Sequence, residues 1–210
     1  MAPFIAFEGG EGAGKSTQIK LLSERLKADS IDHIVTREPG GTAAAEAIRE
    51  LLLSGADERW NARSEALLFA AARADHVARV IRPAIAAEQW VLCDRFVDSS
   101  RAYQSAGEGL DDDAIMQLHA IGSGGLLPDL TILLEISQEV ALGRIRARDG
   151  EDHDRFQRRD ANFHQQVAEA FHQFAEADPD RFLVINAEQN PEQVHAAICT
   201  YLRQKGLLTS

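Results

Sequence analysis

The sequence is poor in cysteine and has no long apolar run. Its two cysteines, Cys93 and Cys199, form no Cys-x-x-Cys pair, so we interpret both as reduced structural thiols. No stretch approaches the roughly 18 apolar residues of a membrane-spanning helix, and the first residues lack the charged and apolar segments of an export signal. We therefore expect a cytoplasmic protein that does not associate with a membrane.

Basic residues are also scarce, and lysine especially so. The 210 residues contain 33 Asp and Glu against 22 Lys and Arg, which gives a formal net charge of −11. Binding to nucleic acid needs clustered basic residues, so this balance argues against a nucleic-acid partner and allows small anions that are bound locally. Four of the 22 basic residues are lysines. Arginine suits bidentate recognition of phosphate, although genomic base composition explains an arginine excess equally well at most positions.

Short β-rich runs alternate along the chain with longer segments of helical periodicity. Several short runs are continuously apolar, which is typical of strands buried on both faces of a parallel sheet. The alternation predicts an α/β fold with a doubly wound five-stranded parallel sheet flanked by helices, in a single domain over residues 1–210. A densely charged stretch interrupts the pattern, and we expect a mobile lid at about residues 144–160. The expected strands are residues 4–7, 33–36, 90–93, 130–134 and 182–185, and the expected helices are residues 15–28, 43–54, 61–87, 111–121, 138–148, 160–177 and 191–204.

A phosphate-binding loop is the most specific motif. Residues 9–16 match G-x-x-x-x-G-K-[ST] and lie between a predicted strand and a predicted helix. Glycines let backbone N–H groups turn toward a phosphate chain, Lys15 would reach the β- and γ-phosphates, and Ser16 would bind Mg²⁺. The fold is therefore expected to be of the P-loop NTP hydrolase and nucleoside monophosphate kinase type. The predicted phosphate contacts are Gly9, Gly10, Glu11, Gly12, Ala13, Gly14, Lys15, Ser16 and Thr17.

A P-loop by itself does not distinguish switches, motors and kinases. The strings D-x-x-G and N-K-x-D, which a GTPase switch would carry, do not occur in the sequence, and the chain is short for a motor. A small kinase needs only this core, a second pocket and a lid. Length and architecture therefore favour a kinase.

Two pairs of residues are candidates for the second pocket. Phe69 and Arg73 lie four positions apart on one helix face and could hold a flat base, although Phe69 could equally belong to the core with Arg73 solvated beside it. Asp94 and Arg95 end a predicted central strand, where open α/β sheets bind ligands, but a structural ion pair would look the same. The residues alone leave both interpretations open.

Four strings along the chain are considered together: the P-loop G-x-E-G-A-G-K-S, Thr36-Arg37-Glu38-Pro39-Gly40-Gly41-Thr42, Cys93-Asp94-Arg95-Phe96 and Ser99-Ser100-Arg101-Ala102-Tyr103-Gln104. In this order they closely resemble those of bacterial thymidylate (dTMP) kinases. The resemblance extends from about Phe4 through the last strand. It implies an Mg²⁺-dependent, homodimeric enzyme that transfers the γ-phosphoryl group of ATP to dTMP, which gives ADP and dTDP for dTTP biosynthesis.

The resemblance also implies roles for individual residues. Phe69 corresponds to the thymine-stacking phenylalanine of the family, Arg73 to its base-reading arginine and Tyr103 to the tyrosine beside the deoxyribose, although Tyr103 could also be a core residue. Ser16 and Asp94 are expected to position Mg²⁺. The expected dTMP contacts are Glu11 at the 3′-hydroxyl, Arg37 and Arg95 on the phosphate side, and Phe69, Arg73, Ser99, Ser100, Tyr103 and Gln104. The alternative for the P-loop glutamate is an outward, solvated side chain.

The expected lid is rich in arginine. Family members that lack an arginine after the acidic P-loop residue carry their catalytic arginines in the lid, and Gly12 occupies that loop position here. The resemblance also places Arg144 beneath the adenine. The sequence departs from the family at Gln157, where glutamate is usual, and at Ala168, where arginine is common. The expected catalytic residues are Lys15, Arg95, Arg148, Arg155 and Glu11.

The sequence leaves two other functions open. Another nucleoside monophosphate kinase or a deoxynucleoside kinase would share the loop and the lid but differ at Phe69, Arg73 and Ser100. A nucleotide-gated regulatory module would bind ATP without turning it over. Turnover with a panel of acceptor nucleotides distinguishes these alternatives.

Overall fold

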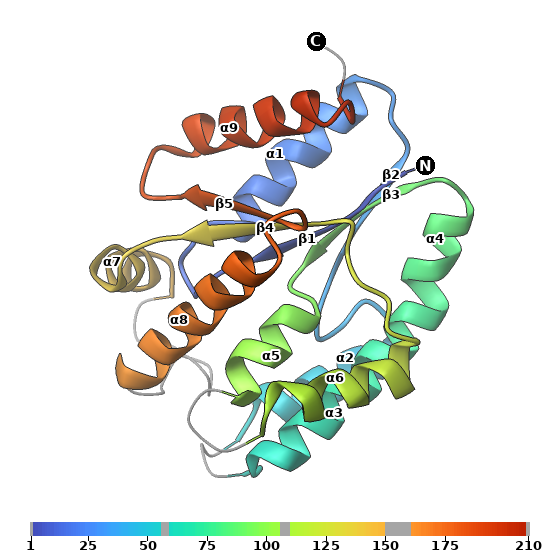
Figure 1. Cartoon of the computed structure of the whole chain (residues 1–210), viewed down its shortest axis with the longest axis vertical. Helices are drawn as coiled ribbons and strands as arrows, with labels where there is room; N and C mark the ends of the chain where they lie inside the picture. The colour runs from blue at the N-terminus through green and yellow to red at the C-terminus, as the bar shows by residue number, and fades with distance from the viewer. Residues whose placement is uncertain (1, 56–58, 106–109, 150–160, 209–210) are drawn as a thin grey trace.

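A five-stranded parallel sheet forms the centre of the molecule (Figure 1). The computed structural model describes residues 2–55, 59–105, 110–149 and 161–208, without the side chains of residues 146, 148 and 149. The strands are β1 (Phe4–Glu8), β2 (His33–Arg37), β3 (Trp90–Asp94), β4 (Leu130–Glu135) and β5 (Phe182–Asn186). Their order is β2-β3-β1-β4-β5, and every neighbouring pair is parallel. The expected α/β fold with a doubly wound sheet is confirmed.

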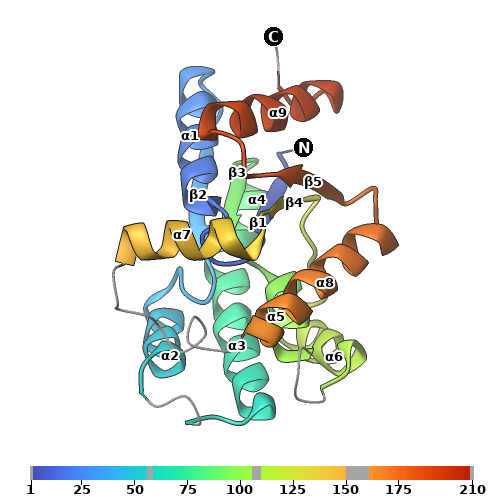
Figure 2. The ribbon, with the colours of Figure 1, turned by 90° about the vertical axis from the view of Figure 1, so that its left-hand side faces the viewer.

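Helices cover both faces of this sheet. Those of the described ranges are α1 (Lys15–Ala28), α2 (Ala43–Leu53), α3 (Ala62–His76), the π-helical segment η1 (Val77–Ile81), α4 (Arg82–Ala86), α5 (Val97–Ser105), α6 (Asp112–Ser123), α7 (Gln138–Asp149), α8 (Ala161–Ala177) and α9 (Pro191–Gln204). In Figure 1, α1 and α9 lie on one face, α4, α5 and α8 lie on the other, and α2, α3 and α6 form a layer farther from the sheet. Figure 2 shows α7 between α1 and the pair α2 and α3. No helix of the described ranges combines the length and the apolar character needed to cross a membrane.

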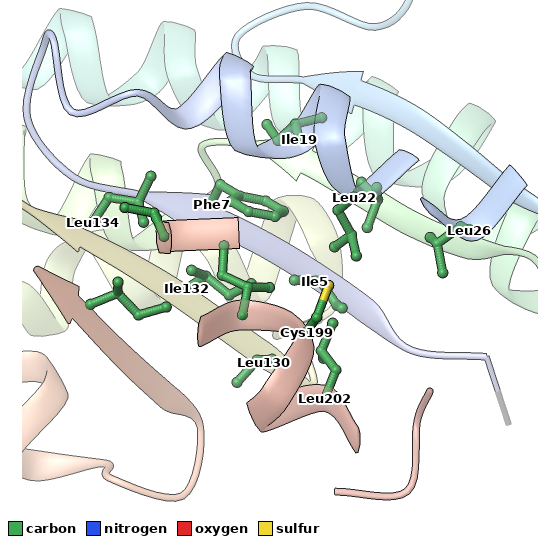
Figure 3. Close-up of a cluster of buried hydrophobic side chains, with 14 of the residues drawn as sticks. Ile5, Phe7, Ile19, Leu22, Leu26, Leu130, Ile132, Leu134, Cys199 and Leu202 are labelled. Carbon is green, nitrogen blue, oxygen red and sulfur yellow. The ribbon is translucent and has the colours of Figure 1, made fainter. Parts of the chain in front are cut away.

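The largest apolar cluster fixes α1 on the sheet (Figure 3). Every residue of β1 is buried, as expected for a central strand of a parallel sheet. Ile19, Leu22 and Leu26 recur at helical spacing along α1 and pack in one cluster with Ile5 and Phe7 of β1. Burying each of these side chains contributes roughly 1.5–3 kcal/mol. This packing holds the loop between β1 and α1 at the carboxyl end of the sheet.

The chain changes direction across the sheet beside β1. From β1 it proceeds to β2 and β3 on one side and then crosses to β4 and β5 on the other. Phe7 of β1 pairs with Asp94 of β3, so the loops that follow these two strands begin next to each other. Ligands of open α/β sheets bind at such a switch point, outside the carboxyl ends of the strands.

Two helical segments differ from the expected elements. The helix expected at residues 61–87 is interrupted by the five-residue π-helical segment η1, which separates α3 from α4. α5 is not predicted by the pattern, because its buried face includes the polar residues Asp98, Ser100 and Gln104. The missed helix nevertheless carries several of the expected substrate contacts.

Candidate active site

The P-loop curves around the space directly after β1. At Gly9, φ is +132° and an added Cβ would lie 2.4 Å from the carbonyl oxygen of Leu134. A side chain is therefore excluded there by both conformation and space. Lys15 begins α1 and folds back over the loop, where its Nζ donates hydrogen bonds to the carbonyl oxygens of Gly9 at 3.0 Å and Gly10 at 2.8 Å. The ammonium group is held where the phosphates of a nucleotide would lie.

Two basic side chains converge at the mouth of this loop. Burial lowers the pKa of Lys15, and the positive charge of Arg95 lowers it further. Arg95 has a left-handed backbone, with φ of +66°, and its Nη1 donates to the carbonyl oxygen of Gly9 at 3.2 Å and to Ser99 Oγ at 3.1 Å. Placing two cations together in a poorly solvated site is unfavourable unless anions accompany them. The site is electrostatically suited to bind phosphate.

Glu11 of the P-loop faces inward. Arg95 Nη2 donates to the Glu11 carboxylate and, at 3.4 Å, to the Tyr103 hydroxyl group. The Arg95 guanidinium carbon also lies 5.2 Å from the centre of the Tyr103 ring. The solvated position considered for Glu11 is therefore not observed. The ion pair considered between Asp94 and Arg95 is not found in the described part of the chain, where Arg95 pairs with Glu11.

Ser16 and Asp94 meet at the same edge. The Ser16 hydroxyl donates to Asp94 Oδ2 at 3.1 Å, which joins the first turn of α1 to the end of β3. A hydroxyl and a carboxylate oxygen are hard ligands of the kind that Mg²⁺ takes. Among the described residues, no group of three or more His, Cys, Asp or Glu side chains could hold a metal. Other ligands would have to come from a bound nucleotide and water.

A cleft of about 830 Å³ lies over the P-loop. Arg144 of α7 crosses one side of it, where its Nη2 donates to the carbonyl oxygen of Ala187 at 2.9 Å and its Nη1 donates to that of Gly12 at 3.4 Å. Gln18 of α1 is buried, donates to the carbonyl oxygen of Pro191 at 2.9 Å and keeps Oε1 without a hydrogen bond to the described residues. Gln18 was not expected at the site. The lining consists of Glu11, Gly12, Ala13, Gly14, Lys15, Ser16, Thr17, Gln18, Arg37, Glu38, Arg49, Asp94, Arg95, Arg144 and residues 187–191 and 194.

A second pocket adjoins this cleft. Its lining includes Glu11, Phe69, Arg73, Arg95, Ser99, Ser100, Tyr103 and Gln104, all of them expected contacts of the acceptor nucleotide. Arg73 is only 3% exposed, so the alternative of a solvated Arg73 is wrong. Gln104 is 2% exposed, and neither atom of its amide has a hydrogen-bond partner among the described residues. A buried amide is seldom left unsatisfied, so this amide is suited to bond a polar ligand or a water molecule in the pocket.

Some expected residues lie elsewhere or outside the described ranges. Arg37 is exposed on the larger cleft, forms an ion pair with Glu46 at 3.0 Å and does not line the second pocket. The backbone of Arg148 belongs to α7, but its side chain is not among those described. Arg155 and most of the expected lid also lie outside the described residues.

Glu8, the last residue of β1, is a buried carboxylate that sequence reasoning missed. It accepts hydrogen bonds from the backbone N–H groups of Phe96 at 2.8 Å and Ser99 at 3.1 Å, and from Ser99 Oγ at 2.6 Å. Burial raises the pKa of Glu8 to about 7, and the positive charge of Arg95 opposes this shift. Glu8 thereby fixes the turn that carries Arg95. The signal in the sequence is a carboxylate at the end of an otherwise apolar strand.

A further lining residue, Arg49, was not expected, whereas Glu38 belongs to the segment at residues 36–42 that carries part of the family resemblance. Arg49 of α2 and Glu38 after β2 line both the larger cleft and the second pocket. Arg49 Nη1 donates to the carbonyl oxygen of Pro39 at 2.9 Å, so α2 is joined to the turn after β2. Arg49 lies on an amphipathic helix with no motif around it, and sequence reasoning had no means to distinguish it from a surface arginine.

Comparisons with known proteins agree with one another. The family model described as thymidylate kinase matches residues 7–198. The thymidylate kinase of Rhizorhabdus wittichii is 56% identical over 195 residues, which cover 93% of this chain and 94% of that protein. The thymidylate kinase of Caulobacter vibrioides is 50% identical over 202 residues, 96% of each chain. The crystal structure of thymidylate kinase from Ehrlichia chaffeensis has a TM-score of 0.77 at 30% identity, and the match covers 96% of this chain and 98% of that chain.

Proposed function

The chain belongs to the thymidylate kinase family, and we propose that its two adjoining cavities divide the substrates of that enzyme between them. The enzyme transfers the γ-phosphoryl group of ATP to dTMP and forms ADP and dTDP. The assignment of substrates to cavities is carried by one observation, which is that Glu11 and Arg95 line both cavities. A phosphoryl group that is transferred between the two nucleotides must pass these residues, which lie where the two cavities meet.

ATP is assigned to the larger cleft. The P-loop and Lys15 would hold its phosphates, since backbone N–H groups at a helix N-terminus and a buried ammonium group both favour negative charge. Arg144 and Gln18 both line this cleft, and we place the adenine between these two residues. The Gln18 Oε1 atom, which has no partner among the described residues, could accept a hydrogen bond from the exocyclic amino group.

Ser16 and Asp94 are the proposed protein ligands of Mg²⁺. Their hydroxyl and carboxylate oxygens lie together beside the P-loop and fit the preference of this ion for oxygen. When bound, Mg²⁺ would neutralise charge on the β- and γ-phosphates. Removal of the metal should therefore abolish turnover.

dTMP is assigned to the second pocket. Phe69 would stack on the thymine, and Arg73, Ser100 and Gln104 would meet its polar edge. Tyr103 would lie against the deoxyribose, where its ring leaves little room for a 2′-hydroxyl group. The acceptor phosphate would face the shared wall of the two cavities.

Alignment and positive charge are the main contributions that we assign to the protein in the transfer step. The acceptor phosphate is already an anion at neutral pH, so no general base is required. Lys15 and Arg95 would stabilise the charge on the transferring group, and Glu11 would orient the acceptor through its 3′-hydroxyl. Arg148 and Arg155 remain our proposed catalytic arginines of the lid. Arg37 is proposed to contact the acceptor nucleotide on its phosphate side.

Two further properties are proposed for the whole chain. We propose that the protein forms a homodimer and that α3 and α6 supply the interface between the two copies. A cytoplasmic location is proposed because Cys93 and Cys199 are both free and buried, which suits a reducing compartment.

An ADP-release assay with ATP and Mg²⁺ tests the proposal. The acceptors would be dTMP, dUMP, dCMP, dGMP and UMP, each with and without EDTA. We expect turnover with dTMP well ahead of the others and no turnover in EDTA. Preference for another acceptor would support a kinase function but contradict the assignment of dTMP to the second pocket. ATP binding without any acceptor-dependent release of ADP would indicate a regulatory module.

A further inference from the structure

A chain of buried hydrogen bonds lies behind the second pocket. His76, the last residue of α3, is fully buried; its Nδ1 lies 2.9 Å from Glu38 Oε1 and its Nε2 lies 2.6 Å from Thr36 Oγ1. The other oxygen of Glu38 accepts a hydrogen bond from Arg73 Nε at 2.6 Å. The members of this hydrogen-bond network are Thr36, His76, Glu38 and Arg73. It connects β2 to the pocket wall without contact with solvent at its centre.

The direction of these hydrogen bonds follows from the groups involved. A carboxylate oxygen only accepts, so His76 Nδ1 must carry the proton that it donates to Glu38. The Thr36 hydroxyl group can donate or accept, so it pairs with Nε2. Both ring nitrogens are satisfied in this arrangement, and the negative charge of Glu38 faces the positive charge of Arg73.

Arg73 is held on two sides. Besides Glu38, its Nη2 donates to Ser100 Oγ at 2.9 Å and to the carbonyl oxygen of Phe96 at 3.3 Å. Nη1 makes no hydrogen bond to any residue that the structure describes, although Arg73 lines the pocket. The Nη1 N–H groups are therefore available to a ligand in the pocket, and their direction depends on how Glu38 is held.

Gly41 packs closely against the His76 ring. Gly41 has φ of +86°, and an added Cβ there would lie 2.5 Å from His76 Nε2 and 2.7 Å from Thr36 Oγ1. The backbone at Gly41 therefore closes against the ring. His76 is confined by contact as well as by its hydrogen bonds.

We propose that His76 is a positioning residue that selects the acceptor base through Glu38 and Arg73. By holding the Glu38 carboxylate, His76 directs the free donors of Arg73 at a carbonyl oxygen of the pyrimidine. A base with an amino group at that position, such as cytosine, would place donor against donor and be rejected. The inference rests on the proposed placement of dTMP in the second pocket.

Two substitutions at His76 separate hydrogen bonding from packing. His76→Asn keeps an amide N–H near the position of Nδ1 and can still donate to Glu38, whereas His76→Gln places its amide near Nε2 and cannot. Loss of a hydrogen bond to a buried charged group corresponds to about a tenfold effect or more on binding. We expect His76→Gln to raise the KM for dTMP at least about tenfold, with kcat changed less than about threefold and the KM for ATP unchanged. His76→Asn should stay within about threefold of the wild type in all three constants.

Base selectivity gives the second measurement. The ratio of kcat/KM for dTMP to that for dCMP should fall in His76→Gln and be retained in His76→Asn. Equal kinetics and equal loss of Tm in the two variants would overturn the proposal, because His76 would then act by packing alone. If His76→Gln does not fold, Thr36→Val takes its place, with an expected rise of about threefold in the KM for dTMP; an unchanged KM would overturn the proposal.

An Arg73→Lys variant distinguishes a failure of this inference from a failure of the proposed function. A lysine keeps the charge but not the paired donors of the guanidinium group. Loss of dTMP selectivity in Arg73→Lys with none in His76→Gln would reject the role of His76 and keep the pocket assignment. Retention of selectivity in Arg73→Lys would reject the pocket assignment, and the proposal about His76 with it.

Discussion

At the scale of single residues, burial determines the behaviour of the charged groups around the P-loop. Lys15, Arg95 and Glu8 have all lost most of their contact with water, and their charges lie close enough to influence one another. In a medium of low polarity a charge is tolerated only when a partner or a ligand compensates for it. The binding of phosphate and the stability of the folded state are therefore linked at these residues.

Lys15→Ala tests the phosphate-binding role of the ammonium group. We expect kcat to fall by about 100-fold or more, because a positive charge next to the transferring group is removed. Turnover by ADP release and folding by circular dichroism measure the two effects separately. Lys20→Ala is the matched control, since the Lys20 side chain is 76% exposed on the same helix. Wild-type turnover in Lys15→Ala would contradict the role of the P-loop lysine.

Glu8→Gln tests the effect of the buried carboxyl group on the pH dependence of stability. The pKa of Glu8 is raised from 4.5 to about 7, so between these values the folded state binds more protons than the unfolded state. The free energy of unfolding should therefore fall as the pH rises through this interval, by up to about 3 kcal/mol from this group. Glu8→Gln should remove this contribution, which urea denaturation at several pH values measures.

Glu24→Gln serves as the control for that experiment, because the Glu24 side chain is 61% exposed. In the Glu24→Gln variant, the free energy of unfolding should depend on pH in the same way as in the wild type. The same slope in Glu8→Gln and in the wild type would show that Glu8 is not the group responsible.

At the scale of elements, the buried carboxylate of Asp98 is a main anchor of α5. Asp98 is fully buried and accepts hydrogen bonds from Arg101 Nη1 at 2.9 Å and Arg181 Nη1 at 2.6 Å. Thr131 of β4 also donates to it at 3.3 Å. Asp98 thereby joins α5 to β4 and to the residue that precedes β5. The pocket residues of α5 are positioned by these ionic contacts and by the packing of Ala102 against α8 and β4.

Asp98→Ala should destabilise the protein strongly. The variant removes the buried carboxylate that Arg101 and Arg181 share and leaves them only their more exposed partners Asp112 and Asp178 among the described residues. Loss of one partner from a buried ionic network costs roughly 3–5 kcal/mol. Asp112 is the other carboxylate bound to Arg101, and the Asp112 side chain is 41% exposed. Asp112→Ala should therefore cost about 1 kcal/mol or less. Denaturant unfolding measures both variants. Similar losses in the two would contradict the role assigned to Asp98.

The alternation of strands and helices could be predicted because each element has its own periodicity. α1 and α9 begin and end as expected from the sequence, since their apolar residues recur at helical spacing beside clear start signals. α5 could not be predicted in this way. Its buried face meets other polar groups, and a polar residue that is buried against a distant partner looks the same in the sequence as an exposed one.

At the scale of the whole molecule, an outer helical layer leaves apolar side chains uncovered. Leu67 of α3 is 57% exposed and Ile121 of α6 is 85% exposed. The two helices pack closely, since an added Cβ at Gly122 of α6 would lie 3.4 Å from the carbonyl oxygen of Ala70 in α3. Exposed apolar side chains on adjoining helices are suited to bury against a second copy of the chain.

Ile121→Asp tests the proposed homodimer. A charge at this position should shift the sedimentation coefficient from that of a dimer to that of a monomer at micromolar concentration, because burying an unpaired carboxylate in an interface is unfavourable. Leu127→Asp is the control at another exposed apolar position, 38% exposed outside these helices. A monomeric wild type, or an Ile121→Asp variant that remains dimeric, would contradict the assignment of this face.

The sequence by itself determined the P-loop, the order of strands and the α/β class. These features depend on contacts within a few residues or on a repeated apolar pattern, and both can be read along the chain. The roles of Phe69, Arg73 and Tyr103 could be inferred only through resemblance to a family, because their spacing alone was equally compatible with core packing.

The tertiary structure decided which distant polar groups meet. Glu8 reaches Ser99, Glu38 reaches Arg73 and His76, and Arg49 comes to the wall between two cavities. None of these partners is near in sequence, and serine, glutamate and arginine side chains are usually exposed. Such pairs form because the sheet brings the ends of separate strands together and removes water from between them, so they are determined by the fold as a whole.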